Sequence, residues 1–267
     1  MAELINNNRI IGGISPQSAE RALHVYERFC QGQISLTDDL TAEMCKLMEN
    51  TYRDVNIAVA NVFARIAEDA GVDVWEAIKQ ANLHPRVKIL NPGPGVGGHC
   101  IPVDPWFLVQ DFPAHAELFR QARMVNDSQP VRLLERIVQA GKLKAGDKLA
   151  LLGAAYKADI DDPRESPAAL MALAAAKMGL KVSVHDPLVS AGEHHGLLIS
   201  NDLSACLHGA DAVVLLTDHK SYRNLSPEFF KKDMKGRVIA DARNWMNHAA
   251  LRNAGFTVLV VGIGRIN

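Results

Sequence analysis

The segment best suited to chemistry is residues 95–104, which reads Gly-Val-Gly-Gly-His-Cys-Ile-Pro-Val-Asp. Glycines before a thiol let the backbone approach a ligand closely and adopt conformations that other residues avoid. Cys100 in such a loop could act as a nucleophile, and Asp104 could hold a proton or orient a water molecule. The alternative is a buried cysteine in a glycine-rich turn. Because sequence neighbours rarely form a working Cys–His pair, none is predicted between His99 and Cys100.

A second set of polar groups falls on a long helical pattern. Apolar residues recur at helical spacing through residues 40–70, and Gly71 is suited to end that helix. Lys46 and Asn50 are four residues apart and therefore share one helix face. Facing a pocket, they could stabilise an oxyanion or hold a water molecule. The alternative interpretation is a solvated polar face.

A third set consists of cations that follow predicted strands. Lys157 and Arg164 lie between the apolar run 148–152 and a helix that Ser166 and Pro167 should start, and Arg243 follows the run 238–241. Cations at the carboxyl ends of parallel strands suit phosphate or carboxylate groups. Surface ion pairs are the alternative explanation for any one of them.

The elements that must position these groups alternate between strand and helix after residue 147. Strands are predicted at 148–152, 182–186, 212–216, 238–241 and 258–261. This alternation predicts an α/β fold with a Rossmann-like parallel sheet. The preceding region is predicted to be helical, with one helix ending near Asn126 and another starting at Pro130. Residues 1–38 form only a βαβ-like piece, with strands at 9–13 and 33–36.

Glycine spacing argues against a complete dinucleotide site in this sheet. The pair Gly262 and Gly264 follows a strand but is not followed by a helix, and Gly153 lacks the second and third glycines of Gly-x-Gly-x-x-Gly. A mononucleotide could still bind at the carboxyl ends of the strands.

The composition argues against nucleic-acid-binding and membrane-spanning classes of protein. The 267 residues are 48% hydrophobic and 22% charged with a net charge of -1, which predicts a globular protein of two compact units without attraction to nucleic acid or membranes. No segment approaches the roughly 20 apolar residues of a membrane span, and no signal-peptide core is present. Four cysteines without metal-ligand spacing predict reduced thiols, no metal site and a cytoplasmic location.

Four motifs in order resemble the UDP-glucose/GDP-mannose dehydrogenase family. They are the nucleophile motif at 97–104, the Lys/Asn helix at 41–50, the opening of the UDP-binding domain at 153–167 and the closing Asp-Ala-Arg-Asn signature at 241–244. Residues 49–56, 84–86 and 91–107 look like the UDP-N-acetylmannosamine branch rather than the glucose branch. Relatives that act on UDP-N-acetylglucosamine share much of this pattern.

The resemblance implies a division into three parts. Residues 1–38 would be a remnant of an N-terminal NAD-binding domain, 39–127 a central helical dimerisation domain with the Cys loop, and 128–267 a C-terminal UDP-sugar-binding Rossmann-like domain. The main NAD site is expected to be missing, and the chain is expected to be inactive alone. The resemblance also implies a homodimer that forms through the helix 40–70. It implies a role in polysaccharide biosynthesis. Alternatively, the apolar stripe of that helix is core.

The implied reaction is an NAD-dependent double oxidation of the sugar 6-hydroxyl to a uronate, through a thiohemiacetal and a thioester on Cys100. The resemblance implies that Lys46 and Asn50 stabilise the oxyanion and position the water. It implies that Asp104 assists the proton transfer. Contacts to the UDP-sugar would come from Lys157, Arg243, Gly97 and Gly98, with Arg86 reaching across a dimer interface and Arg164 touching the NAD diphosphate. Competing interpretations are a non-catalytic nucleotide-sugar binding or dimerisation module, a dehydrogenase of UDP-N-acetylglucosamine or UDP-glucose, and a hydrolase using Cys100 and His99.

Overall fold

The computed structural model describes residues 1–264 and divides the chain into two compact units, Met1–Tyr52 and Arg53–Asn267. The first unit contains α1 (Ala2–Asn6), β1 (Arg9–Gly13), α2 (Pro16–Tyr26), β2 (Ile34–Asp38) and the start of α3 (Asp39–Ala70). Strands β1 and β2 pair in parallel, and Ser15 caps α2 through a reciprocal bond with Ser18. The predicted βαβ piece is therefore confirmed.

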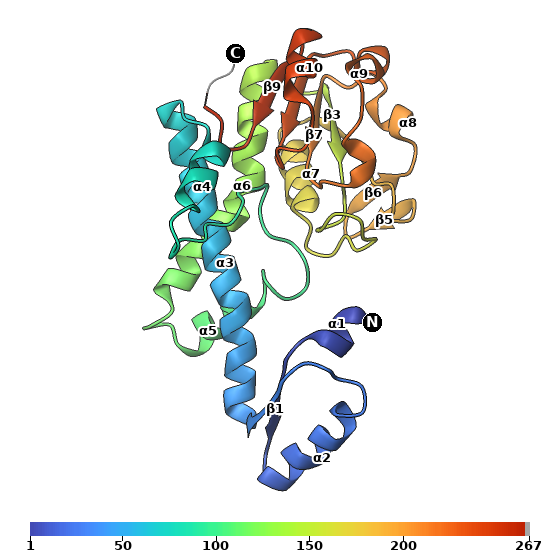
Figure 1. Ribbon diagram of the computed structural model, residues 1–267. Coiled ribbons are helices and arrows are strands. Elements are labelled where there is room, and N and C mark those ends of the chain that lie inside the picture. The colour runs from blue at the N-terminus through green and yellow to red at the C-terminus, as the bar shows by residue number, and fades with distance from the viewer. Residues whose placement is uncertain (265–267) are drawn as a thin grey trace. The chain divides into compact units, whose positions relative to one another are not determined.

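The second unit begins with helices: the rest of α3, then α4 (Val74–Ala81), α5 (Asp104–Asp111) and α6 (Glu117–Gly141) (Figure 1). The prediction of a new helix at Pro130 was wrong, because Pro130 lies inside α6. Proline has no N–H, so the Asn126 carbonyl loses its usual helical partner. Gly95, at φ +128°, approaches this point so closely that a Cβ there would lie 3.0 Å from the Asn126 oxygen.

Buried polar side chains join α3 to α6 within the second unit. Arg123 donates to Asp54 Oδ1 at 2.6 Å, and Asn126 Nδ2 donates to the same oxygen at 2.8 Å. Asn61 Nδ2 extends the network by donating to Asn126 Oδ1 at 2.9 Å. Burial raises the pKa of Asp54, and the Arg123 charge opposes that rise. Such a network fixes the pairing of two helices, because leaving one buried charge unpaired typically costs about 3–5 kcal/mol.

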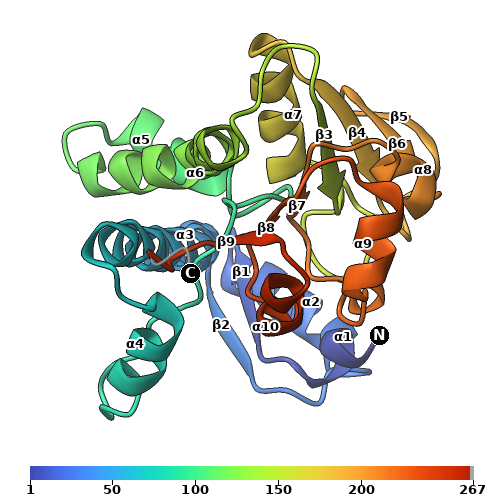
Figure 2. The same ribbon diagram turned by 90° about the horizontal axis from the view of Figure 1, so that it is seen from above.

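A seven-stranded sheet follows, in the order β5-β6-β4-β3-β7-β8-β9 (Figure 2). The strands are β3 (Lys148–Leu152), β4 (Lys181–His185), β5 (Gly192–His194), β6 (Leu197–Ser200), β7 (Ala212–Leu215), β8 (Val238–Asp241) and β9 (Thr257–Val260). All neighbours are parallel except β5 and β6. From β6 to β9 the order is that of the doubly wound dinucleotide fold, which confirms the predicted α/β class.

Helices cover both faces of this sheet, as a parallel sheet requires. Leu149 and Leu151 pack with α6 and α7 (Pro167–Lys177) in one apolar core. Their alternates Ala150 and Leu152 pack in a second core with α8 (Leu203–Leu207), α9 (Pro227–Asp233) and α10 (His248–Asn253). The predicted helix starts are confirmed, since Ser166 and Ser226 accept hydrogen bonds from the backbone of α7 and α9. In residues 1–264, no helix is long and apolar enough to span a bilayer.

The carboxyl end of the sheet is closed between β3 and β7, where the strand order reverses. Gly153 adopts φ +98°, and a Cβ there would lie 2.4 Å from Thr217 Cβ. Asp186, just after β4, corresponds in position to the acid that binds a ribose in dinucleotide folds. Here the carboxylate is fully buried and accepts from the backbone N–H groups of Ala154 and Ala155 at 2.8 and 2.9 Å. This end of the sheet therefore does not fit a dinucleotide.

Asp186 also accepts from His219 Nε2 at 3.1 Å and from the backbone N–H groups of Leu188 and Val189. Burial alone would raise the pKa of Asp186, but these hydrogen bonds outweigh it and hold the pKa well below its usual value. One carboxylate thus fixes the loops that follow both β3 and β4.

The glycine pair near the end of β9 serves packing. A Cβ on Gly262, at φ +81°, would lie 2.1 Å from Val74 Cγ1, and a Cβ on Gly264 would lie 2.1 Å from the Glu68 carbonyl oxygen. The Gly262 carbonyl accepts from Val74 N–H at 2.9 Å. These glycines let the strand end approach α3 and α4 directly.

Replacing Asp186 by Asn should destabilise the fold by at least about 2 kcal/mol at pH 7, because an NH2 group would face backbone donors in place of a charged acceptor. The folded pKa lies below the unfolded value of about 3.9, so the stabilisation is present above that pH and is lost as the pH falls below it. The difference between D186N and the parent in urea unfolding should therefore shrink below about pH 4. Asp202→Asn, at an exposed helix cap that Asn also serves, is the control. An equal, pH-independent loss in both variants would contradict this account.

Candidate functional site

Residues 91–103 form a loop, here called the Cys100 loop, whose first part is tied to three elements. Gly93 N–H donates to Asn61 Oδ1 of α3 at 2.9 Å, and the Gly93 carbonyl accepts from Gln129 of α6 at 3.4 Å. A Cβ on Gly93 would lie 2.9 Å from a terminal guanidinium nitrogen of Arg243, which follows β8. The start of the loop therefore joins the helical region to the carboxyl end of the sheet.

The middle of the Cys100 loop packs against the loop between β3 and α7. A Cβ on Gly97 would lie 2.6 Å from the Glu165 carbonyl oxygen and 2.7 Å from Tyr156 Cβ. Gly98, at φ +94°, lies under the Tyr156 ring and donates its N–H to the Arg164 carbonyl at 3.1 Å. No other residue type fits at these two positions without moving one of the loops.

Cys100 is half-buried, and its thiol lies beside an exposed histidine. Cys100 Sγ is 3.0 Å from His99 Nδ1, so the two side chains are in contact, whereas the prediction that they form no working pair stays a prediction. The Cys100 carbonyl accepts from the backbone N–H groups of Val103 and Asp104 at 3.0 and 2.8 Å. This turn brings Asp104, the first residue of α5, one helical turn beyond the thiol.

The sheet contributes Arg243 to the same region, on a turn that a buried acid holds. Asp241 accepts from the backbone N–H groups of Arg243, Trp245 and Met246 at 2.9, 2.7 and 2.8 Å. The Arg243 side chain donates through Nε to Asp218 at 2.9 Å, which leaves its terminal nitrogens beside Gly93. The predicted cation at this strand end is thus close to the Cys100 loop.

The loop after β3 carries the other predicted cations. Arg164 is exposed and donates to both oxygens of Asp162, and these bonds lower the pKa of Asp162. Lys157 is exposed, and within residues 1–264 it forms no ion pair. Arg164 is joined to the Cys100 loop through its backbone, whereas Lys157 remains available to a ligand.

Three predicted residues lie outside this cluster of contacts. Lys46 and Asn50 belong to the part of α3 in the first unit, which is described by itself; there Lys46 is exposed near Glu49 and Asn50 is buried. Arg86 is exposed in the segment after α4, and its backbone N–H donates to His84 Nδ1 at 3.3 Å. Their roles beside Cys100 stay predictions.

The sequence interpretation missed several residues that support the loop: Asn61, Gln129, Tyr156 and Asp218. A signal for the first two exists, because amides inside apolar helical stripes are usually buried partners of a specific backbone group. Tyr156 and Asp218 carry no comparable signal. Within residues 1–264, no group of three His, Cys, Asp or Glu side chains could hold a metal ion.

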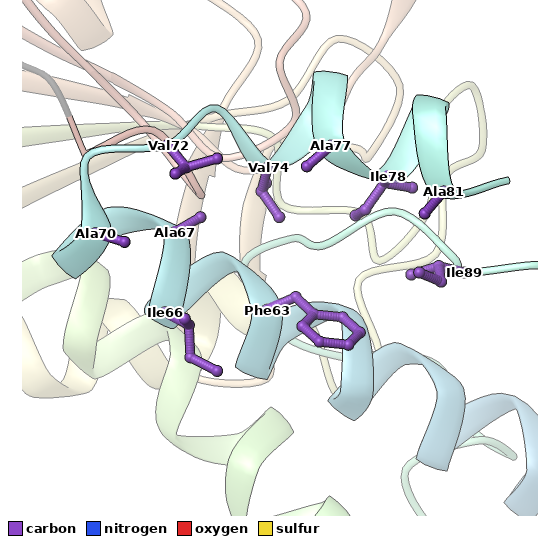
Figure 3. A pocket seen from close by; sticks show the side chains of 10 residues that line it. All are labelled: Phe63, Ile66, Ala67, Ala70, Val72, Val74, Ala77, Ile78, Ala81 and Ile89. Carbon is purple, nitrogen blue, oxygen red and sulfur yellow. The ribbon is translucent and has the colours of Figure 1, made fainter.

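An apolar groove lies apart from the Cys100 loop, between the end of α3 and α4 (Figure 3). Its volume is about 270 Å³, and all the side chains that line it are hydrocarbon: Phe63, Ile66, Ala67, Ala70, Val72, Val74, Ala77, Ile78, Ala81 and Ile89. Phe63 and Ile66 remain 43% and 56% exposed. A groove of this composition suits an apolar protein surface better than a charged ligand.

Comparison with known proteins agrees with this geometry. Residues 40–128 match the central domain of the UDP-glucose/GDP-mannose dehydrogenase family, and residues 150–248 match the UDP binding domain of the same family. The two matches contain the Cys100 loop and the strand ends that meet it.

Individual relatives point the same way. The chain is 46% identical over 99% of its length to the UDP-N-acetyl-D-mannosamine dehydrogenase of Methanocaldococcus jannaschii, of which it spans 61%. It is also 46% identical over 91% of its length to an NDP-N-acetyl-D-galactosaminuronic acid dehydrogenase of Ralstonia nicotianae, of which it spans 57%. The solved UDP-D-ManNAc dehydrogenase of Pyrococcus horikoshii superposes with a TM-score of 0.88 at 41% identity, covering 98% of this chain and 62% of that one. The chain belongs to the UDP-glucose/GDP-mannose dehydrogenase family.

Proposed function

We propose that this chain binds the UDP-sugar and carries the nucleophile of a UDP-N-acetylmannosamine 6-dehydrogenase, which forms a uronate in polysaccharide biosynthesis in the cytoplasm. The observation that carries the proposal is the contact of the Cys100 loop with both Arg243 and the loop after β3. When the nucleotide binds at the carboxyl end of the sheet, the thiol of a loop that contacts this end can reach the sugar attached to that nucleotide. The names of the M. jannaschii and P. horikoshii relatives support the choice of sugar.

Cys100 acts on the sugar carbon after its first oxidation. The sulfur adds to the C6 aldehyde, the carbonyl electron pair moves to oxygen, and a thiohemiacetal results. Removal of a hydride from the carbon of this adduct and of the proton from its hydroxyl leaves a thioester, which water hydrolyses to the carboxylate and the free thiol. Lys46 and Asn50 stabilise the oxyanion and position that water, and Asp104 assists the proton transfers.

The UDP part is held by cations and glycines at the carboxyl end of the sheet. Arg243 and Lys157 bind the diphosphate, since a guanidinium and a free ammonium suit phosphate oxygens. Gly97 and Gly98 allow the sugar to approach the loop backbone, and Arg86 reaches the substrate bound to a second subunit. In this proposal residues 39–127 form the central domain and 128–267 the UDP-sugar domain.

Both oxidations need a hydride acceptor, and the family resemblance implies NAD. The closed switch point of the sheet does not fit it, because Thr217 fills the space beside Gly153 and Asp186 is saturated by protein donors. We therefore propose that this chain binds the substrate and supplies the nucleophile. Arg164 is its only predicted contact to the cofactor.

A homodimer through α3 belongs to the same proposal. Val59, Val62, Phe63 and Ile66 form an exposed apolar stripe on α3, and the groove against α4 continues it (Figure 3). Burying such a stripe in a second copy is favourable by roughly 25 cal/mol for each Å² of apolar surface.

Calorimetric titration tests the ligand assignment. UDP and UDP-N-acetylmannosamine should bind the purified chain with Kd values that Arg243→Leu raises at least about tenfold, because one charge-assisted phosphate contact is worth about 1.5–3 kcal/mol. Arg237→Leu is the matched control, since Arg237 is exposed at the other end of the same strand. NAD should give no heat, and NAD with UDP-N-acetylmannosamine should give no NADH. Binding of NAD, or equal effects of the two arginine variants, would contradict the proposal.

Sedimentation velocity tests the dimer. Ile66→Glu should convert the protein from dimer to monomer, because a carboxylate would be buried in the apolar stripe without a partner. Leu198→Glu, at another exposed aliphatic side chain, should leave the dimer intact. A monomeric parent protein, or a dimer that survives I66E, would rule out this interface.

A further inference from the structure

The contact between His99 and Cys100 has no part in the reaction as described so far. His99 Nδ1 lies 3.0 Å from Cys100 Sγ, within hydrogen-bond range for sulfur. The imidazole is exposed and the thiol is half-buried, so both can be reached from the solvent. An imidazole at this distance can accept the thiol proton and leave the nucleophilic thiolate.

The backbone on both sides holds this pair in register. Before it, Gly98 adopts φ +94° and donates to the Arg164 carbonyl at 3.1 Å. After it, the Cys100 carbonyl accepts from Val103 and Asp104. With its two ends fixed, the dipeptide turns both side chains to one side, which sequence neighbours in extended chain do not do.

Two groups of opposite charge, both in the loop after β3, interact with this pair. Asp162, in the loop after β3, lies near enough to His99 for its charge to interact with the imidazole. Arg164, in the same loop, interacts in the same way with Cys100. Asp104 of α5 is the further titratable group at this turn, and Tyr156 covers Gly98. Asp162 has the charge opposite to that of an imidazolium, Arg164 has the charge opposite to that of a thiolate, and the two also form an ion pair with each other.

We propose that His99 is a catalytic residue that takes the proton of the Cys100 thiol and returns it to the substrate oxygen. The S–H bond breaks with its electron pair left on sulfur, and the proton moves to Nδ1. The sulfur pair then forms the C–S bond to the aldehyde carbon, and the carbonyl pair moves to oxygen, which receives the Nδ1 proton. No oxidant enters this step. The role in turnover depends on the proposed function, whereas the proton transfer itself does not.

Alkylation of Cys100 by iodoacetamide, followed by peptide mass spectrometry, tests the proton transfer in the chain without any substrate. At pH 7 the parent should react at least tenfold faster than His99→Ala or His99→Asn. Asn can accept a hydrogen bond from the thiol but cannot take its proton. At about pH 10 the rates should agree within about threefold, because hydroxide can then remove the thiol proton in every variant without a neighbouring base.

Two internal references make the result decisive. His115→Asn changes another exposed histidine of the same unit and should leave the profile unaltered, and Cys45 reports general accessibility in each digest. Equal rates at pH 7 would overturn the proposal. A deficit that is undiminished at pH 10 would also overturn it, because it would show that His99 only shapes the loop. If UDP does not bind but alkylation follows the expected profile, the proposed function is wrong and the proton transfer from Cys100 to His99 is supported.

Discussion

The candidate site depends on one close approach of two backbones. Gly97 and Gly98 lie so near Tyr156 and Glu165 that a single added methyl group would overlap the facing loop. The Gly98 amide turns this proximity into a hydrogen bond to Arg164. Glycines cost conformational entropy on folding, about 0.5–1 kcal/mol each relative to Ala. That cost is offset by a geometry in which a loop from the helical region lies against the carboxyl end of the sheet.

Buried carboxylates give this end of the sheet its rigidity. Asp186 follows β4 and accepts hydrogen bonds from backbone N–H groups of the loops after β3 and β4. Asp241 ends β8 and accepts hydrogen bonds from backbone N–H groups of the turn that carries Arg243. Both acids are fully buried and their donors are mainly backbone groups. In each case a negative charge at a strand end is used to shape the protein rather than to bind a ligand. The groups left for a ligand are cations, glycines and the thiol.

Much of this architecture could be predicted from the sequence, and the exceptions have physical reasons. Apolar runs bounded by turn residues gave the strands that form the buried sheet to within one residue, because burial on both faces demands such runs. The edge strand Gly192–His194 was missed because it contains no apolar run, and Leu197–Ser200 was missed because its apolar run is only three residues long. Pro130 was misread as a helix start because a proline shortly after a serine is typical of a first helical turn, whereas here it lies inside α6.

The candidate site, like the fold, contains features that could be predicted from the sequence and features that could not. The sequence placed Cys100 and Asp104 by a glycine-rich loop and Arg243 after a strand, and the structure has them there, while their roles stay predictions. The pairing of His99 with Cys100 could not be predicted, since it depends on the positive φ of Gly98 and on a partner more than sixty residues away in Arg164. Local sequence names the reactive groups, whereas long-range contacts decide which of them face each other.

The glycine pair after β9 has a consequence for the use of sequence patterns. Gly262 and Gly264 have the spacing that opens a nucleotide-binding signature, yet their neighbours are Val74 and the backbone of Glu68. A glycine in a pattern encodes only the absence of a side chain and is silent about what occupies the vacated space. A search that scores glycine spacing alone will therefore return packing contacts between helices and strands together with true phosphate cradles, and only the element that follows the motif separates the two.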